Sequence, residues 1–317
     1  MFYFIVNRLS GNGHGLKAWK RIQPLLREKE IDYRVEFPES PDQAAYLLRK
    51  FVKETERVDV VAVVGGDGTV QSVAGELAGS GIPLGVIPAG SGNDLARALG
   101  IPLIPVKALD HMLTGTIKKM DMAQSGNKAC VTVVGIGIDG QIAQTVNHSR
   151  YKKWFNALSL GRLTYVLSLL QVLFRYRPLT VNIKVDETEM SFSDVWLIAV
   201  ANIPNYGGGM HICPDASYTD GVFDICIVHG ISRFGVIRIF PRVIAGKHIY
   251  RPGISMLRGQ EIKIFSSNPM LAHGDGEVIG ETPIDISIRR EAIHVICQEK
   301  SRDPSREFRE LSRQQRQ

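Results

Sequence analysis

The sequence predicts an α/β domain with a doubly wound parallel sheet, followed by a mainly antiparallel, β-sandwich-like second domain. Up to about residue 121, short apolar runs alternate with helical segments, the pattern of a parallel sheet covered by helices. From about residue 129 onward, short strand-like runs between glycine or polar turns dominate. With 317 residues, 44% of them hydrophobic, the chain is long enough for a core in each domain.

We place the first domain at residues 1–125 and expect a Rossmann-like architecture. The apolar run at 60–64 does not alternate with polar residues, so it predicts a strand buried on both faces. The predicted elements are, in chain order, a strand at 2–6, helices at 16–30 and 40–54, a strand at 58–64, a helix at 69–78 and a strand at 83–88.

We place the second domain at residues 126–298 and expect mainly strands. These cover residues 130–136, 179–185, 195–201, 222–228, 261–266 and 284–289. Residues 205–210 contain three consecutive glycines, which predict either a mobile loop at the mouth of a cleft or a wide turn. The tail at 299–317 is highly charged and predicts a solvated or frayed helix, able to pack back on the first domain.

Three predicted strands of the first domain end in polar, glycine-rich loops. These loops read Asn7-Arg8-Leu9-Ser10-Gly11, Gly65-Gly66-Asp67-Gly68-Thr69 and Gly90-Ser91-Gly92-Asn93-Asp94. Because the carboxyl ends of parallel strands meet at one edge of a sheet, the loops predict a single nucleotide crevice. A structural alternative is that Asn93 or Asp94 only caps the following helix.

The glycine spacing of the first loop does not match the dinucleotide fingerprint, so no nicotinamide site is predicted. The helix that follows this loop directs its N-terminus toward it, which favours an anion there. Asp67 lies within a loop of phosphate-binding type, where an acid suits the handling of a magnesium ion or of a hydroxyl proton.

The second and third loops together resemble the diacylglycerol kinase catalytic domain of bacterial lipid kinases and sphingosine kinases. The first loop is similar to the Asn-Pro-x-Ser-Gly loop of that family, with Arg8 in place of proline. Residues 214–224 resemble its Pro-x-Ala-x-x-x-Asp-Gly-x-x-Asp element, and residues 273–277 resemble its late Asp-Gly-Glu motif. The resemblance runs from about Met1 to about Gln298, with all motifs in the family's order.

The resemblance implies ATP as a substrate, bound mainly by the glycine-rich loops. The hydroxyl of Ser91 and that of Ser40 match family positions that contact the nucleotide. The nucleotide-binding residues implied in this way are Asn7, Ser10, Gly11, Ser40, Gly66, Asp67, Gly68, Thr69, Val70, Gln71, Ser91, Asn93 and Asp94.

The resemblance also implies the proton acceptor and a metal site. Glu277 matches the glutamate regarded as the proton acceptor, although some relatives give that role to the aspartate matching Asp67. A structural Mg²⁺ site is implied at the Asp220 carboxylate with carbonyls of Ser217 and Val222, and ligation by oxygen alone suits magnesium.

One departure from the family pattern follows Thr69, where relatives continue with x-Asn-Glu. This chain has Val70, Gln71 and Ser72 there, so a carboxylate is absent from the edge of the site. The departure keeps open a catalytically weak, nucleotide-responsive lipid-binding protein. A second alternative is a kinase of a soluble substrate, since NAD kinases share a similar Gly-Gly-Asp-Gly-Thr loop.

Phosphoryl transfer requires phosphates held in line, cations that neutralise charge, and a base near the attacking hydroxyl. Backbone N–H groups of the three loops meet the first requirement. Magnesium held by ATP with Asp67, and through water with Asp94 and Asp121, meets the second, although Asp121 is equally well a turn acid at a strand end. Asp67 or Glu277 meets the third, and the choice depends on geometry.

The net charge of +6 and the pI near 9.1 predict anionic partners. Residues 150–177 form a basic-aromatic segment, and no acidic residue occurs between Asp139 and Asp186. We expect this segment to contact an anionic membrane surface and to deliver lipid to the cleft, or else to pack in the core with a basic flank. Interruptions by Gly161, Arg162 and Gln171 argue against a transmembrane helix.

Four scattered cysteines without a Cys-x-x-Cys pair predict reduced thiols, and the chain opens on a strand without a basic leader. We therefore expect a cytoplasmic protein that associates peripherally with the membrane. Neither helix-turn-helix nor zinc-finger nor RNA-binding patterns occur, so no nucleic-acid partner is expected. The function expected first is ATP-dependent phosphorylation of a lipid hydroxyl, in phospholipid metabolism. Oligomeric state stays open, although an edge strand of the second domain can pair in a homodimer.

Overall fold

The structure is a computed structural model that describes residues 1–55, 57–142, 172–275 and 277–298. The first domain contains four parallel strands in the order β2-β1-β3-β4. They are β1 (Phe2–Val6), β2 (Tyr33–Glu36), β3 (Val60–Gly65) and β4 (Pro83–Pro88). Strand β3 is buried along its whole length, as the unbroken apolar run predicts.

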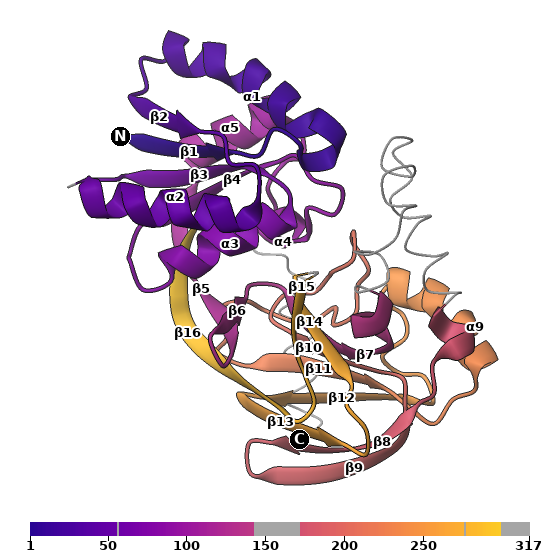
Figure 1. The fold of residues 1–317 in the computed structure, drawn as a ribbon. Helices are drawn as coiled ribbons and strands as arrows, with labels where there is room; N and C mark the ends of the chain where they lie inside the picture. The colour runs from indigo at the N-terminus through magenta and orange to yellow at the C-terminus, as the bar shows by residue number, and fades with distance from the viewer. Residues whose placement is uncertain (56, 143–171, 276, 299–317) are drawn as a thin grey trace, which may run out of the picture.

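Helices cover both faces of this sheet (Figure 1). On one face α1 packs beside α5, and on the other α2 packs beside α3. Their bounds are α1 (Ser10–Glu28), α2 (Pro41–Glu54), α3 (Asp67–Leu77), α4 (Asp94–Ala98) and α5 (Pro105–Thr114). The helices pack in the usual way for surface helices: in α2, for example, Ala44, Leu48 and Phe51 recur at helical spacing and are buried.

One long strand joins the two domains. Strand β16 (Ile284–Cys297) pairs antiparallel with β13 (Glu261–Ser266) near its start and parallel with β4 near its end. It also pairs antiparallel with β5 (Thr116–Ser125), which in turn pairs with β6 (Lys128–Cys130). The mixed sheet therefore continues from the first domain into the second (Figure 1).

The prediction of a strand at 284–289 was too short, since β16 extends to Cys297. The pairing with β5 shifts register between Arg289 and Ile293, and Glu291 there has a φ of 50°. This charged bulge interrupts the alternation in the sequence, and so it hides the second half of the strand.

The second domain stacks two sheets face to face. The mixed sheet contributes β13, β8 (Leu179–Val185) and β9 (Thr188–Val195). A six-stranded antiparallel sheet has the order β12-β11-β10-β7-β14-β15. Its strands are β7 (Val133–Gly137), β10 (Leu197–Ala201), β11 (Phe223–Val228), β12 (Ile254–Gly259), β14 (Leu271–Gly274) and β15 (Glu277–Glu281). Buried side chains from both sheets form one apolar cluster between them, which confirms the β-sandwich-like prediction.

The single strand predicted at 130–136 is wrong, because β6 and β7 are separate strands. Between them, the backbone N–H groups of Val131 and Thr132 donate to the carboxylate of Asp275 at 2.9 and 3.0 Å. A side chain thus replaces the ladder partner at this point, which the apolar pattern alone does not reveal.

All four cysteines are buried free thiols. Within the described residues, no helix is long and apolar enough to cross a membrane. Most of the basic-aromatic segment at 150–177 and the whole tail at 299–317 lie outside the described residues.

Candidate active site

The three glycine-rich loops meet at the carboxyl edge of the parallel strands. A Cβ atom on Gly90 would lie 2.4 Å from the Cα of Gly66, and one on Gly11 would lie 2.2 Å from the carbonyl oxygen of Ala89. Real side chains do not fit at either distance, so glycine is required for the three backbones to touch. The sequence prediction that these loops converge is confirmed by this contact.

Asp67 lies at the centre of this contact, in the first turn of α3. Its carboxylate accepts the backbone N–H groups of Asn93 and Asp94, both at 2.7 Å. Burial, and next the nearby charge of Asp94, together raise the pKa of Asp67 from its usual 3.8 to about 6, against the lowering effect of the two hydrogen bonds. Such a pKa places the carboxyl group close to the range in which a general base works near neutral pH.

The first loop is held to the second by Asn7. The side-chain amide of Asn7 donates to the hydroxyl of Thr69 at 2.9 Å, and its carbonyl oxygen accepts the N–H of Ser10 at 3.1 Å. Gly11, Asn12 and Gly13 follow in the left-handed region. The prediction that α1 begins at residue 16 missed this distorted first turn, because its glycines read as a loop.

Asn93 shapes the third loop from within. It has a φ of 55°, and its side chain forms two hydrogen bonds with the backbone of Gly90, at 2.8 and 2.9 Å. Asn93 therefore holds Gly90 against the second loop instead of capping α4 by its side chain. On the same loop, the guanidinium of Arg97 donates to the carbonyl of Gly92 at 3.1 Å, which places a cation beside the loop.

Asp94 links the first domain to the second. Its buried carboxylate accepts the backbone N–H groups of Gly208 and Gly209 at 2.9 and 2.8 Å, and the side-chain amide of Asn205 at 3.3 Å. The glycine-rich segment 205–210 is itself a turn closed by two backbone hydrogen bonds between Tyr206 and Met210. Of the two expectations for this segment, the structure shows the turn, pinned to Asp94.

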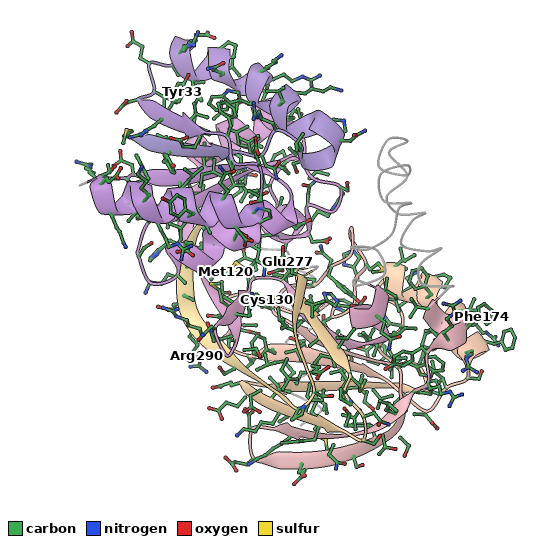
Figure 2. All side chains as sticks on the ribbon, in the orientation of Figure 1. Tyr33, Met120, Cys130, Phe174, Glu277 and Arg290 are labelled. Atoms are coloured by element: carbon green, nitrogen blue, oxygen red, sulfur yellow. The ribbon has the colours of Figure 1, made fainter. Side chains whose placement is uncertain are left out.

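The late motif brings two further carboxylates to the junction of the domains. Glu277 begins β15 and is exposed, and Figure 2 shows it near Cys130 where the second domain meets the first. Asp275 is half-buried and accepts hydrogen bonds from Val131 and from Thr132. Burial raises its pKa, and its charge contributes to the raised pKa of Asp67. Sequence reasoning singled out Glu277 and missed Asp275, although both belong to the same motif.

His273, at the start of this motif, forms a buried pair with Asp139 that the sequence did not reveal. Nε2 of His273 and Oδ2 of Asp139 are 2.8 Å apart, and both side chains are buried. Burial lowers the pKa of His273, but the charge of Asp139 and the hydrogen bond to it outweigh burial and raise the pKa overall. The ring of Tyr206 stacks on His273, so the pair joins β14 to the 205–210 turn.

The comparisons with known proteins agree with this geometry. Residues 1–125 match the family model described as the diacylglycerol kinase catalytic domain. Residues 132–297 match the YegS C-terminal NAD kinase beta sandwich-like domain. A diacylglycerol kinase of Mycobacterium tuberculosis (strain H37Rv) is 32% identical, over 92% of this chain and 93% of its own length. The chain belongs to the diacylglycerol kinase family.

A second relative and a solved structure are also similar to this chain. A diacylglycerol kinase of Bacillus subtilis (strain 168) is 31% identical, over 75% of this chain and 77% of its own length. A crystal structure of a diacylglycerol kinase from Bacillus anthracis (strain Sterne) superposes with a TM-score of 0.72 at 22% identity, covering 96% of this chain and 97% of that one. That likeness shows the shared fold. A kinase of the lipid or diacylglycerol type follows from the family, and ATP is the substrate that such kinases imply.

The chain's departure from the family pattern after Thr69 has structural partners. The amide of Gln71 donates to the carbonyl of Ala129 at 3.1 Å, which ties α3 to β6. The hydroxyl of Ser72 donates to the carbonyl of Gly68 at 3.2 Å, inside the helix. Val70 is buried in the core. The nucleotide roles implied for Val70 and Gln71 stay predictions.

The two serines implied at the nucleotide lie on different elements. Ser40 caps α2, its hydroxyl accepting the N–H of Gln43 at 3.2 Å. The start of α2 lies beside α3, since Cγ of Pro41 is 4.0 Å from a Cβ built on Gly68. Ser91 is exposed in the third loop. Their contacts with nucleotide stay predictions.

The metal site implied at Ser217, Asp220 and Val222 lies on one turn after the 205–210 segment. One carboxylate oxygen of Asp220 forms an ion pair with Arg258, and the other accepts the N–H of Val222 at 3.3 Å. A cationic side chain thus faces the carboxylate, an arrangement that does not fit a metal ion bound at the same oxygens. The magnesium site stays a prediction.

Asp121 is the other acid weighed for a magnesium role. It is buried, and its carboxylate accepts the backbone N–H groups of Gly221 and Glu291, both at 2.8 Å. These bonds connect β5 to the turn around Asp220 and to the bulge in β16. They account for Asp121 as a structural acid.

Proposed function

We propose that this protein transfers the γ-phosphate of ATP to a hydroxyl group of a membrane lipid, diacylglycerol or another, in phospholipid metabolism. The observation that carries the proposal is the position of Asp67, a half-buried carboxylate at the point where three glycine-rich backbones touch. Such a point combines close backbone approach for phosphates with one group able to take a proton. Family membership supports the same reaction class.

The loops bind the triphosphate of ATP through backbone N–H groups. The first turn of α3 begins at Asp67, directly after Gly66, so its N–H groups and helix dipole favour phosphate there. Arg97 adds a positive charge on the third loop. Magnesium bound with ATP would neutralise the remaining phosphate charge, as in other phosphoryl transfers.

The reaction needs one bond made, one broken and one proton moved. The acceptor hydroxyl oxygen bonds to the γ-phosphorus while the bond from that phosphorus to the β–γ bridging oxygen breaks, and ADP leaves with the electron pair. The hydroxyl proton passes to a carboxylate. We assign this role to Asp67, whose pKa of about 6 keeps it mostly ionised at neutral pH yet basic enough to accept a proton. Glu277 is the rival acceptor.

The lipid acceptor is proposed to reach the site from an anionic membrane surface contacted by the basic-aromatic segment 150–177. Its described end contains the exposed Phe174 and the cations Arg175 and Arg177. Exposed aromatic and basic side chains together suit the interfacial region of an anionic bilayer.

Transfer of label from γ-labelled ATP tests the proposal. The protein is incubated with Mg²⁺ and either total lipid extract, diacylglycerol or NAD, beside Asp67→Asn and Glu277→Gln variants. We expect a labelled lipid with the wild type and a strongly reduced, residual amount of it with Asp67→Asn at neutral pH. Label on NAD alone would favour an NAD kinase, and nucleotide binding without any labelled product would favour a catalytically weak lipid-binding protein.

A further inference from the structure

Helix α9 (Arg233–Ile244) has apolar residues on two opposite faces. An inner stripe at helical spacing is buried against the core and consists of Val236, Ile239 and Val243. An outer stripe, also at helical spacing, is exposed and consists of Phe234, Ile237 and Ile244. The outer face of a helix on a water-soluble surface is normally polar. Its apolar stripe therefore indicates a partner outside the described chain.

Exposure of this face is extensive. Phe234 is 77% exposed, and Tyr250, shortly after the helix, is 89% exposed. Single exposed apolar residues are common on protein surfaces. Their usual frequency does not explain an apolar stripe along α9 that is followed in the sequence by the exposed ring of Tyr250.

The sequence around α9 carries positive charge alone. Residues 225–260 contain no aspartate or glutamate, but they contain six cations: Arg233, Arg238, Arg242, Lys247, Arg251 and Arg258. Arg258 forms ion pairs with Asp220 and Asp224. Within residues 1–55, 57–142, 172–275 and 277–298, no ion pair involves Arg238, Lys247 or Arg251. Their charge remains available to an anionic partner.

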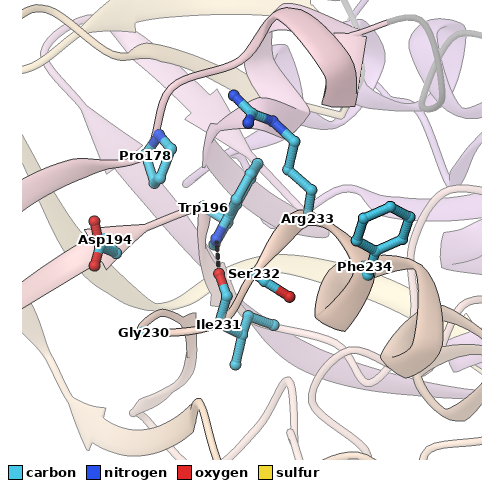
Figure 3. A pocket seen from close by; sticks show the side chains of 8 residues that line it. All are labelled: Pro178, Asp194, Trp196, Gly230, Ile231, Ser232, Arg233 and Phe234. Carbon is cyan, nitrogen blue, oxygen red and sulfur yellow. Dashed lines mark hydrogen bonds between the residues drawn. The ribbon is translucent and has the colours of Figure 1, made fainter.

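The start of α9 adjoins the described end of the basic-aromatic segment. The guanidinium of Arg233 donates to the carbonyl of Tyr176 at 3.1 Å, and Phe174 beside it projects outward (Figure 2). A hollow of about 560 Å³ opens at the same place, lined among others by Trp196 and Phe234 (Figure 3). Phe174 and Phe234 thus place two exposed aromatic rings near the start of α9, and the exposed carboxylate of Asp194 also lines the hollow.

We propose that the outer face of α9, with the segment up to Tyr250, docks on a bilayer that contains anionic phospholipid. A helix that lies in the membrane interface combines an apolar stripe with flanking cations, and here the charge complementarity favours an anionic bilayer over a protein surface. The proposal rests on the proposed function only in taking a membrane as the partner. It assigns the contact to a helix of the second domain, separate from the glycine-rich loops.

Flotation of the full-length protein with vesicles, without nucleotide, tests this docking. Vesicles of phosphatidylcholine are compared with vesicles that also contain phosphatidylglycerol. Phe234→Ser combined with Ile244→Ser is expected to lower the partition coefficient of the protein between vesicles and water by at least about tenfold. Burial of one such apolar side chain in the bilayer changes this coefficient by a factor of about ten or more. Lys247→Gln combined with Arg251→Gln is expected to lower partitioning by at least about tenfold on the anionic vesicles only, at about 1 kcal/mol per cation.

Matched controls place the same changes on other faces. Tyr46→Ser with Phe265→Ser removes two exposed aromatic rings, and Lys50→Gln with Lys53→Gln removes two exposed charges of α2. Helix α2 belongs to the first domain and lies far from α9 (Figure 1). These controls are expected to bind vesicles as the wild type does. Equal losses in controls and α9 variants, or no loss in the α9 variants, would overturn the proposal.

Two further readouts separate this proposal from its rivals. Phosphorylation of a short-chain diacylglycerol dispersed in detergent reports on the kinase reaction alone, and the α9 variants are expected to keep it. If that activity is absent from every protein while the α9 variants still lose vesicle binding, the proposed function fails and the docking stands. If the α9 substitutions leave vesicle binding unchanged and instead convert a dimer to a monomer in sedimentation, the face joins two copies of the chain and the docking fails.

Discussion

The raised pKa of Asp67 predicts how the stability of the nucleotide-free protein depends on pH. Folding raises this pKa from 3.8 to about 6, mainly because the enclosed carboxylate loses water. A folded state that binds its proton more tightly than the unfolded state is stabilised by acid. The contribution of the Asp67 carboxyl group to the free energy of unfolding is therefore fully present below pH 3.8, and it is lost as the pH rises through about 6. At about 1.4 kcal/mol for each pKa unit, it amounts to about 3 kcal/mol.

Urea unfolding of the wild type and of Asp67→Asn across pH 3 to 8 measures this contribution. The amide of the variant does not titrate and cannot accept both N–H groups. The substitution therefore lowers the free energy of unfolding by an amount that does not change with pH. We expect the wild type to lose about 3 kcal/mol relative to the variant between the acid and the neutral end of the range.

Two results would refute this reasoning about Asp67. If the free energies of unfolding of the two proteins differ by the same amount at every pH, the carboxyl group of Asp67 has an ordinary pKa in the folded state. A wild type that gains stability relative to the variant with rising pH would mean that the two backbone hydrogen bonds outweigh the loss of water.

Three further predictions concern the same loops. Activity of the wild type should rise with pH through a midpoint near 6, and this limb should disappear in Asp67→Asn but persist in Glu277→Gln; the reverse pattern would make Glu277 the proton acceptor. Asp94→Asn should move that midpoint to lower pH, because the charge of Asp94 helps to raise the pKa of Asp67; an unchanged midpoint in the pH profile would contradict this coupling. Gly90→Ala should weaken ATP binding in calorimetry by at least about tenfold, because its Cβ would collide with the second loop. The control Gly75→Ala, whose Cβ meets nothing within 4 Å, should bind ATP as the wild type does.

The sequence predicts the convergence of the loops because that follows from local rules. A buried parallel strand that ends in glycines places its loop at the carboxyl edge of the sheet, and all such loops share that edge. Gly66 and Gly90 carry this information in their residue type, since no other residue fits their contact. The strands β8 and β13 were predicted with their observed bounds, because clear turns flank them.

The features that were missed depend on contacts between distant segments. Asp275 binds the backbone at the break between β6 and β7, although it lies 143 and 144 residues away in the sequence. No residue near the break indicates that this contact exists. Asp94 reaches the 205–210 turn across the domain junction, although in the sequence it reads as a helix cap. Pairing across such separations is set by tertiary structure, which a single sequence read by local pattern does not contain.

The central claim is that the loops around Asp67 bind the triphosphate of ATP. Titration calorimetry of the wild type with ATP in the presence of Mg²⁺ tests it most directly, with Gly90→Ala as the variant that separates the loops. We expect saturable uptake of ATP by the wild type and strongly reduced uptake by the variant. Absence of heat from the wild type at every ATP concentration, in a protein shown to be folded, would mean that these loops do not bind ATP.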